Sequence, residues 1–151
     1  MAKNTLDCYV LPAVPLPLLL PKECVAEIVE KPEILQLEAA RANWMKGHVT
    51  WDNQRISVLS YSALHDAELD ESKKRNPVLV VLNPIPDAAR KAFVGLLCFG
   101  KVEEIEVNDN IEQLQIPDNV DRRYIEATVS IGKQKYLIPK LSAMGVAFSY
   151  F

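Results

Sequence analysis

Short apolar runs, each ended by a turn signal, are the feature that most constrains the fold of this chain. The clearest case is 124–139, where apolar and polar residues alternate from Ile125 to Ile131, Gly132-Lys133-Gln134 supply a turn, and an apolar run returns. Alternation with a period of two is typical of a strand with one buried face, and a glycine-containing break between two such runs indicates a hairpin. We therefore predict two antiparallel strands here.

A second hairpin is predicted over residues 43–61, the segment that holds both tryptophans. Val49 and Trp51 fall on one face of the first strand, and the apolar run that ends at Tyr61 forms the returning strand. Asp52-Asn53 stands between the two runs, and both residue types tolerate positive φ. Trp44 and Trp51 are expected to serve as core residues of this hairpin.

The remaining segments extend the same pattern. Runs at 76–84 and 91–100 are continuously apolar, as in strands buried on both faces, and 102–107 alternates. Shorter strand-like runs occupy 7–13, 18–30 and 33–37. A short helix is predicted within 62–72, a connection carrying one helical turn within 108–119, and either a terminal helix or a fraying tail at 140–151. The chain is therefore predicted to be all-β, with about eight to ten strands in small barrels or a sandwich.

Composition limits the class of protein. The chain has 151 residues, 49% of them apolar, which fits one domain spanning 1–151 without a glycine-rich linker. A net charge of −3 argues against a nucleic-acid surface. The apolar run at 9–21 is broken by four prolines and is too short to span a membrane. Three widely spaced cysteines favour a reducing compartment, so a cytoplasmic protein is expected, without direct membrane insertion.

Catalytic and metal-binding patterns are missing from the sequence. The two histidines, His48 and His65, belong to no metal-binding motif, and no phosphate-binding glycine loop or nucleophile elbow occurs. Cys98 lies in an apolar run, which indicates an inert core thiol. The carboxylates of 103–106 are interpreted as a solvated strand face. We expect no enzyme, no cofactor and no metal site.

The order of elements resembles the CheW-like domain family, the adaptors of bacterial chemosensory arrays. The similarity rests on the Val-x-Glu-Ile strand and the Lys-Gly strand with its turn within 25–61, on the paired apolar runs at 76–84 and 90–107, and on the hairpin at 124–141. Most of these motifs are apolar patterns, so their combination and spacing carry the similarity.

The resemblance implies two five-stranded β-barrel subdomains around a shared hydrophobic core, with short helices and no catalytic centre. It implies coupling of chemoreceptor cytoplasmic tips to a CheA-type histidine kinase, with other CheW-like domains as further partners. It places the receptor in a groove between the barrels and further contacts at the hairpin turn. The implied protein-binding residues are Val25, Glu27, Ile28, Gly47, Trp51, Asp52, Asn53 and Val78.

The chain departs from the family pattern at the hairpin turn. Many family members have an Asn-Leu-Arg-Gly sequence where this chain has Thr50-Trp51-Asp52-Asn53, so an anion replaces a cation. Such a reversal at an interface can change the choice of partner. We therefore expect an accessory adaptor of a second chemosensory pathway, such as one that governs type IV pili and twitching motility. The alternative is a small β-barrel that binds a ligand or another protein without a role in a signalling array.

Overall fold

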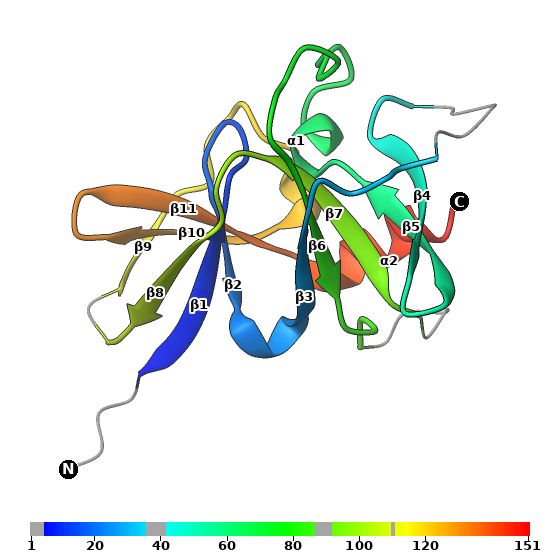
Figure 1. The fold of residues 1–151 in the computed structure, drawn as a ribbon. Coiled ribbons are helices and arrows are strands. Elements are labelled where there is room, and N and C mark those ends of the chain that lie inside the picture. Colours follow the sequence, from blue (N-terminus) through cyan, green and yellow to red (C-terminus); the bar gives the residue numbers. More distant parts are fainter. Residues whose placement is uncertain (1–4, 36–41, 87–91, 110) are drawn as a thin grey trace.

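Two antiparallel-rich β-sheets lie side by side and form most of the molecule (Figure 1). The computed structural model describes residues 5–35, 42–86, 92–109 and 111–151. The first sheet has six strands in the order β8-β1-β2-β11-β10-β9, and the second has five in the order β3-β6-β7-β5-β4. The six-stranded sheet consists of β1 (Leu6–Leu11), β2 (Leu18–Pro21), β8 (Glu103–Val107), β9 (Ile111–Leu114), β10 (Ile125–Ile131) and β11 (Gln134–Pro139). The five-stranded sheet consists of β3 (Val25–Glu30), β4 (Met45–Trp51), β5 (Gln54–Leu59), β6 (Pro77–Leu82) and β7 (Val94–Phe99).

The helices are short. They are α1 (Tyr61–Leu64), α2 (Leu141–Phe148) and the 3₁₀ turns η1 (Lys22–Cys24) and η2 (Arg122–Tyr124). The α2 helix contacts η2 and β5, so it bridges the two halves of the molecule (Figure 1). Of the two alternatives for the last segment, the terminal helix is therefore the one present. Among the described residues, no helix combines the length and apolar character needed to cross a membrane.

The predicted hairpins are confirmed. β4 and β5 pair antiparallel and are joined by Asp52-Asn53, whose φ angles of 48° and 58° define a type I′ turn. β10 and β11 pair in the same way around Gly132-Lys133, with φ of 63° at the glycine. β6 and β7 are buried on both faces, as their continuous apolar runs predict. Leu35 forms an isolated bridge with His48, and the rest of the strand expected at 33–37 lies partly outside the described residues.

Three apolar clusters hold the sheets together. The largest lies between the sheets and takes buried side chains from both, among them Leu11, Leu18, Leu82 and Leu96. This is the central cluster. A second cluster, called the inner cluster, lies on the face of the five-stranded sheet opposite to the central cluster, and a third lies on the corresponding face of the six-stranded sheet. β6 contributes Val80 to the central cluster and Leu79 to the inner one, because successive residues of a strand point to opposite faces. The all-β fold and the shared hydrophobic core are therefore confirmed.

One predicted element was wrong, and another is shorter than expected. The connection at 108–119 contains a strand, β9, which pairs with β10 and gives its sheet six strands instead of the five expected. β9 is an exposed edge strand whose sequence, Ile-Glu-Gln-Leu, places two polar residues side by side. It therefore lacks the alternation of apolar and polar residues that marks a strand with one buried face. The helix expected within 62–72 ends at Leu64, because the Asp66 and Asp70 side chains accept hydrogen bonds from backbone N–H groups two residues on and favour turns.

Candidate protein-interaction site

A groove of about 610 Å³ separates the two sheets on one side of the molecule. Its walls come from β3 and β6 of the five-stranded sheet and from β1, β8 and the segment before β8. The lining residues are Tyr9, Ile28, Glu30, Val78, Gly100, Lys101, Val102, Glu103 and Glu104. Two of the residues predicted from the family resemblance, Ile28 and Val78, therefore lie in the groove.

The floor of the groove is apolar. Ile28 is half-buried on β3, Val78 is 8% exposed on β6, and both contact the central cluster. Val102, in the segment just before β8, also lines the groove and packs against that cluster. A partner that buries its own apolar side chains here would extend the core that joins the two sheets.

Val25 and Glu27 are near the groove in sequence but do not line it. A register shift in the pairing of β3 with β6, between Val25 and Glu27, marks a bulge that changes which side chains share a face. Val25 packs against the central cluster, whereas Val29 packs against the inner cluster of the five-stranded sheet. Glu27 points to this second side, away from the groove.

Glu27 instead joins the two edge strands of the five-stranded sheet. Trp51 Nε1 donates a hydrogen bond of 3.0 Å to Glu27 Oε2, although β4 and β3 are the outermost strands of that sheet. The Trp51 ring also contacts the ring of Phe93, with centroids 5.0 Å apart, and covers the inner cluster. The sheet is therefore curved enough for side chains of its two edge strands to meet. Trp51 packs against the inner cluster, as the apolar alternation of its strand predicts.

The hairpin turn projects beyond this contact. Asp52 and Asn53 are both exposed, in the left-handed conformation that Asp and Asn accept more readily than most residues. Gly47 has a different role, because it is buried, has a φ of 137° and lies at a register shift between β4 and β5. Gly47 therefore permits a bulge and offers no side chain or exposed surface to a partner.

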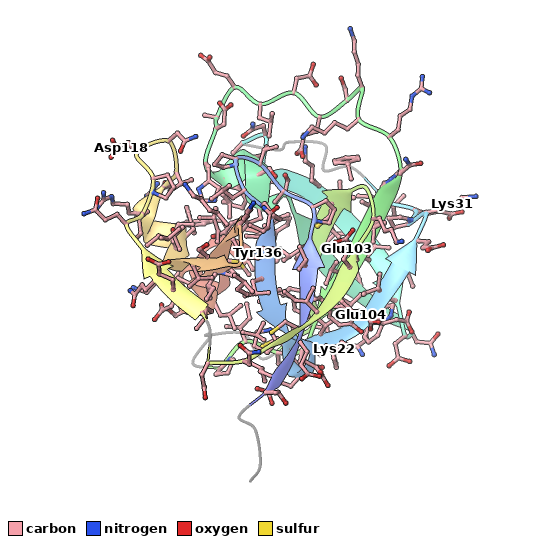
Figure 2. The ribbon with its side chains drawn as sticks, turned by 90° about the vertical axis from the view of Figure 1, so that its left-hand side faces the viewer. Lys22, Lys31, Glu103, Glu104, Asp118 and Tyr136 are labelled. Carbon is pink, nitrogen blue, oxygen red and sulfur yellow. The ribbon has the colours of Figure 1, made fainter. Side chains whose placement is uncertain are left out.

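Charged residues form the rim of the groove, and sequence reasoning missed them. Lys22 Nζ lies 2.8 Å from Glu104 Oε1, a contact that raises the pKa of Lys22 above its ordinary value, and 5.3 Å from the centre of the Tyr9 ring. Figure 2 shows Glu104 just above Lys22, with Glu103 further up and Lys31 to one side. Glu104, one of the carboxylates interpreted as a solvated strand face, therefore borders the groove, and only the placement of β8 against β1 reveals this.

Among the described residues, the buried cysteines and histidine outside the groove have shifted pKa values without forming a reactive site. Burial raises the pKa of the Cys98 thiol to about 12, and desolvation also raises the pKa of Cys8 and Cys24. His65 Nδ1 accepts a 3.0 Å hydrogen bond from the Asp121 backbone, and burial lowers the pKa of this imidazole. Within the described part of the chain, no three His, Cys, Asp or Glu side chains gather as metal ligands would.

Comparison with known proteins places the fold. The family model described as CheW-like domain matches residues 16–145. The crystal structure of the scaffolding protein TtCheW from Thermoanaerobacter tengcongensis superposes with a TM-score of 0.74, covering 93% of this chain and 87% of that one at 15% sequence identity. No curated protein matches the sequence significantly. Because the family model spans most of the chain and the fold agrees, the chain belongs to the CheW-like domain family.

Proposed function

We propose that this protein is a non-catalytic chemotaxis adaptor that couples a chemoreceptor tip to a CheA-type histidine kinase in the cytoplasm. Membership of the CheW-like family supports the adaptor class. The observation that carries the proposal is the groove between the sheets, with Ile28 and Val78 in its apolar floor. It gives the receptor a surface separate from the hairpin turn. The chain acts as one CheW-like domain, and other CheW-like domains are further partners.

The hairpin turn is the proposed second contact and the source of specificity. Asp52 and Asn53 are exposed, and the adjacent Trp51–Glu27 hydrogen bond restrains the position of the turn. The anion at Asp52, where many family members have arginine, suits a kinase surface with a cation at the facing position. We assign the protein to an accessory pathway of the kind that governs type IV pili and twitching motility.

Binding measurements with two purified partners test the adaptor function. A receptor cytoplasmic tip and a CheA-type kinase from the same genome are each titrated against the protein by calorimetry, at tens of micromolar. We expect both to bind and the ternary complex to form. Failure of both to bind would overturn the proposal, because interfaces of standard size are detectable at these concentrations.

A matched pair of variants assigns the receptor to the groove. Ile28→Ser removes apolar surface from the floor, whereas Val146→Ser makes a similar change on α2, at a side chain that is 58% exposed and outside the groove. We expect Ile28→Ser to weaken receptor binding about 10-fold, equivalent to about 1.4 kcal/mol, with kinase binding unchanged. Equal effects of the two variants would place the receptor elsewhere.

Changes in the charge of Asp52 test whether the turn contacts the kinase. Asp52→Asn removes the charge and keeps a side chain that tolerates the φ of 48°, whereas Asp52→Arg reverses the charge and strains that backbone. We expect kinase affinity to fall in the order wild type, Asp52→Asn, Asp52→Arg. Unchanged affinities in both variants would show that the turn is not an interface element.

A further inference from the structure

A cavity of about 120 Å³ lies between the five-stranded sheet and α2, and it shares no lining residue with the groove. Its walls come from β5, from the start of β7, from Ile85 after β6, and from α2 with its C-cap. α2 contacts β5 directly (Figure 1). None of the residues assigned above to receptor or kinase binding lines this cavity, so it is a separate feature of the fold.

Most of the cavity wall is apolar. Ile85, Val94 and Phe148 line it, are between 4% and 7% exposed, and belong to the central cluster. Phe93 stands next to Val94 in the wall and contacts the ring of Trp51. Because these side chains are packed in the core, a small apolar group that enters the cavity is removed from water against them.

Ser57 adds a hydroxyl that has no hydrogen-bond partner among the described residues. Ser57 is 8% exposed and lies on the same face of β5 as Arg55, whereas Ile56 points to the inner cluster on the opposite face. The hydroxyl of Ser149, which also lines the cavity, already donates to a backbone carbonyl of α2. A buried hydroxyl without a partner is unfavourable. Ser57 therefore marks a place in the cavity for a polar atom of a ligand.

Arg55 brings a positive charge to the same cavity. Its Nη2 lies 3.1 Å from His48 Nδ1, and because a guanidinium group has no acceptor, the imidazole nitrogen accepts this hydrogen bond and orients the side chain. Within the described part of the chain, Arg55 has no carboxylate at ion-pair distance. Its other N–H groups can therefore bind an anion, and the planar guanidinium suits the two oxygens of a carboxylate.

We propose that this cavity binds a short aliphatic carboxylate, with its apolar chain against Val94 and Phe148 and its carboxylate accepting hydrogen bonds from Arg55 and Ser57. An ionised carboxylate has about four lone-pair sites, so it can accept from both groups together. A dry protein cavity of about 150 Å³ holds benzene, so the space of about 120 Å³ suits a branched chain of about four or five carbons. The inference goes beyond the adaptor function and does not depend on it.

Isovalerate and isovaleramide test the inference with the full chain. The two molecules share one branched chain, and only isovalerate is charged at pH 7. Each is titrated to tens of millimolar while backbone amide shifts are followed by NMR, because so small a ligand gains limited binding free energy. We expect isovalerate to bind at least about 5-fold more tightly than the amide, with the largest shifts at residues 55–57, 94 and 148–149. Equal affinities, shifts elsewhere, or no binding, as in a cavity that holds water only, would overturn the inference.

A matched pair of arginine variants locates the charge. Arg55→Met keeps a long apolar stem and removes the cation, whereas Arg75→Met makes the same change at an exposed residue outside the cavity. We expect Arg55→Met to lower the affinity for isovalerate to that of isovaleramide, and to leave the affinity for the amide unchanged, a pattern that misfolding would not produce.

Ser57→Ala tests the second donor, and we expect it to weaken isovalerate binding about 3-fold. Unchanged affinity in Arg55→Met, or an equal loss in Arg75→Met, would overturn the inference. Receptor and kinase titrations contain no carboxylate ligand, so failure of this inference leaves the adaptor function intact, and failure of the adaptor function leaves this cavity to be judged by its own titrations.

Discussion

At Gly95 the addition of a single methyl group is expected to destabilise the fold. Gly95 is the second residue of β7 and lies between two buried side chains of the inner cluster. A Cβ added there would lie 2.6 Å from Leu79 Cδ1 and 3.4 Å from Val58 Cγ2. Ordinary contacts between carbon atoms are about 3.5–4.0 Å. Leu79 and Val58 are both 0% exposed, so neither can swing into solvent to make room.

The expected cost of Gly95→Ala follows from this overlap. Inserting a methyl group into a well-packed core costs about 1–3 kcal/mol, and a 2.6 Å approach to a fully buried leucine favours the upper half of that range. Lower entropy of the unfolded chain returns about 0.5–1 kcal/mol. The net loss is therefore about 1–2.5 kcal/mol, which lowers Tm by about 2–10 °C in a chain of this size. Urea denaturation and a thermal melt measure the two quantities.

A double-mutant cycle with Leu79→Ala tests the reason for the loss. Removing the leucine side chain leaves room for the new methyl group, so the two changes together should cost clearly less than the sum of the single changes. Gly132→Ala is the matched control, because its φ of 63° causes strain while no atom lies within 4 Å of the added Cβ, and its cost should add to that of Leu79→Ala. Additive costs for Gly95→Ala and Leu79→Ala, or a stable Gly95→Ala protein, would refute the steric argument.

Three further changes have defined outcomes. Burial lowers the pKa of His65 in the folded protein, so its contribution to stability is complete above the unfolded pKa of about 6.5 and is lost as the pH falls below that value. Urea denaturation at pH 7 and at pH 5 should show this loss of stability. His65→Gln should make the difference between the two pH values smaller. Lys46→Met leaves the Glu71 carboxylate, 2.9 Å from Lys46 Nζ and 3% exposed, without its cation, at a cost of about 3 kcal/mol by urea denaturation that Glu71→Gln largely restores. Trp51→Phe keeps an aromatic ring, although a smaller one, and removes the N–H donor, so hydrogen exchange in β3 should accelerate, with a stability loss of at least about 1 kcal/mol.

The strands could be predicted from the sequence because burial imposes visible periods on them. β6, β7 and the β10–β11 hairpin are each buried on at least one face, and their apolar residues follow that geometry. The Asp52-Asn53 turn was predictable because a type I′ turn needs two residues that accept positive φ. β9 was not predictable, because an exposed edge strand carries no such period.

The candidate site was predictable only in part. Ile28 and Val78, which the family resemblance predicts as binding residues, line the groove, but a bulge in β3 turns Glu27 away from the groove and towards Trp51. A bulge shifts the pairing of β3 with β6 by one residue, and the sequence shows no sign of that shift. Glu30 and Glu104 line the groove from β3 and β8 although they are far apart in the chain. Their proximity depends on the packing of two sheets, which no local pattern reports.

The carboxylates of β8 affect the open edge of their sheet. β3 and β8 are both edge strands, and an open edge can pair with an extended chain. Three glutamates among the five residues of β8, two of them adjacent, disfavour such pairing unless the incoming strand is basic and in register. The charge on β8 therefore protects this edge of the sheet against pairing with extended chains.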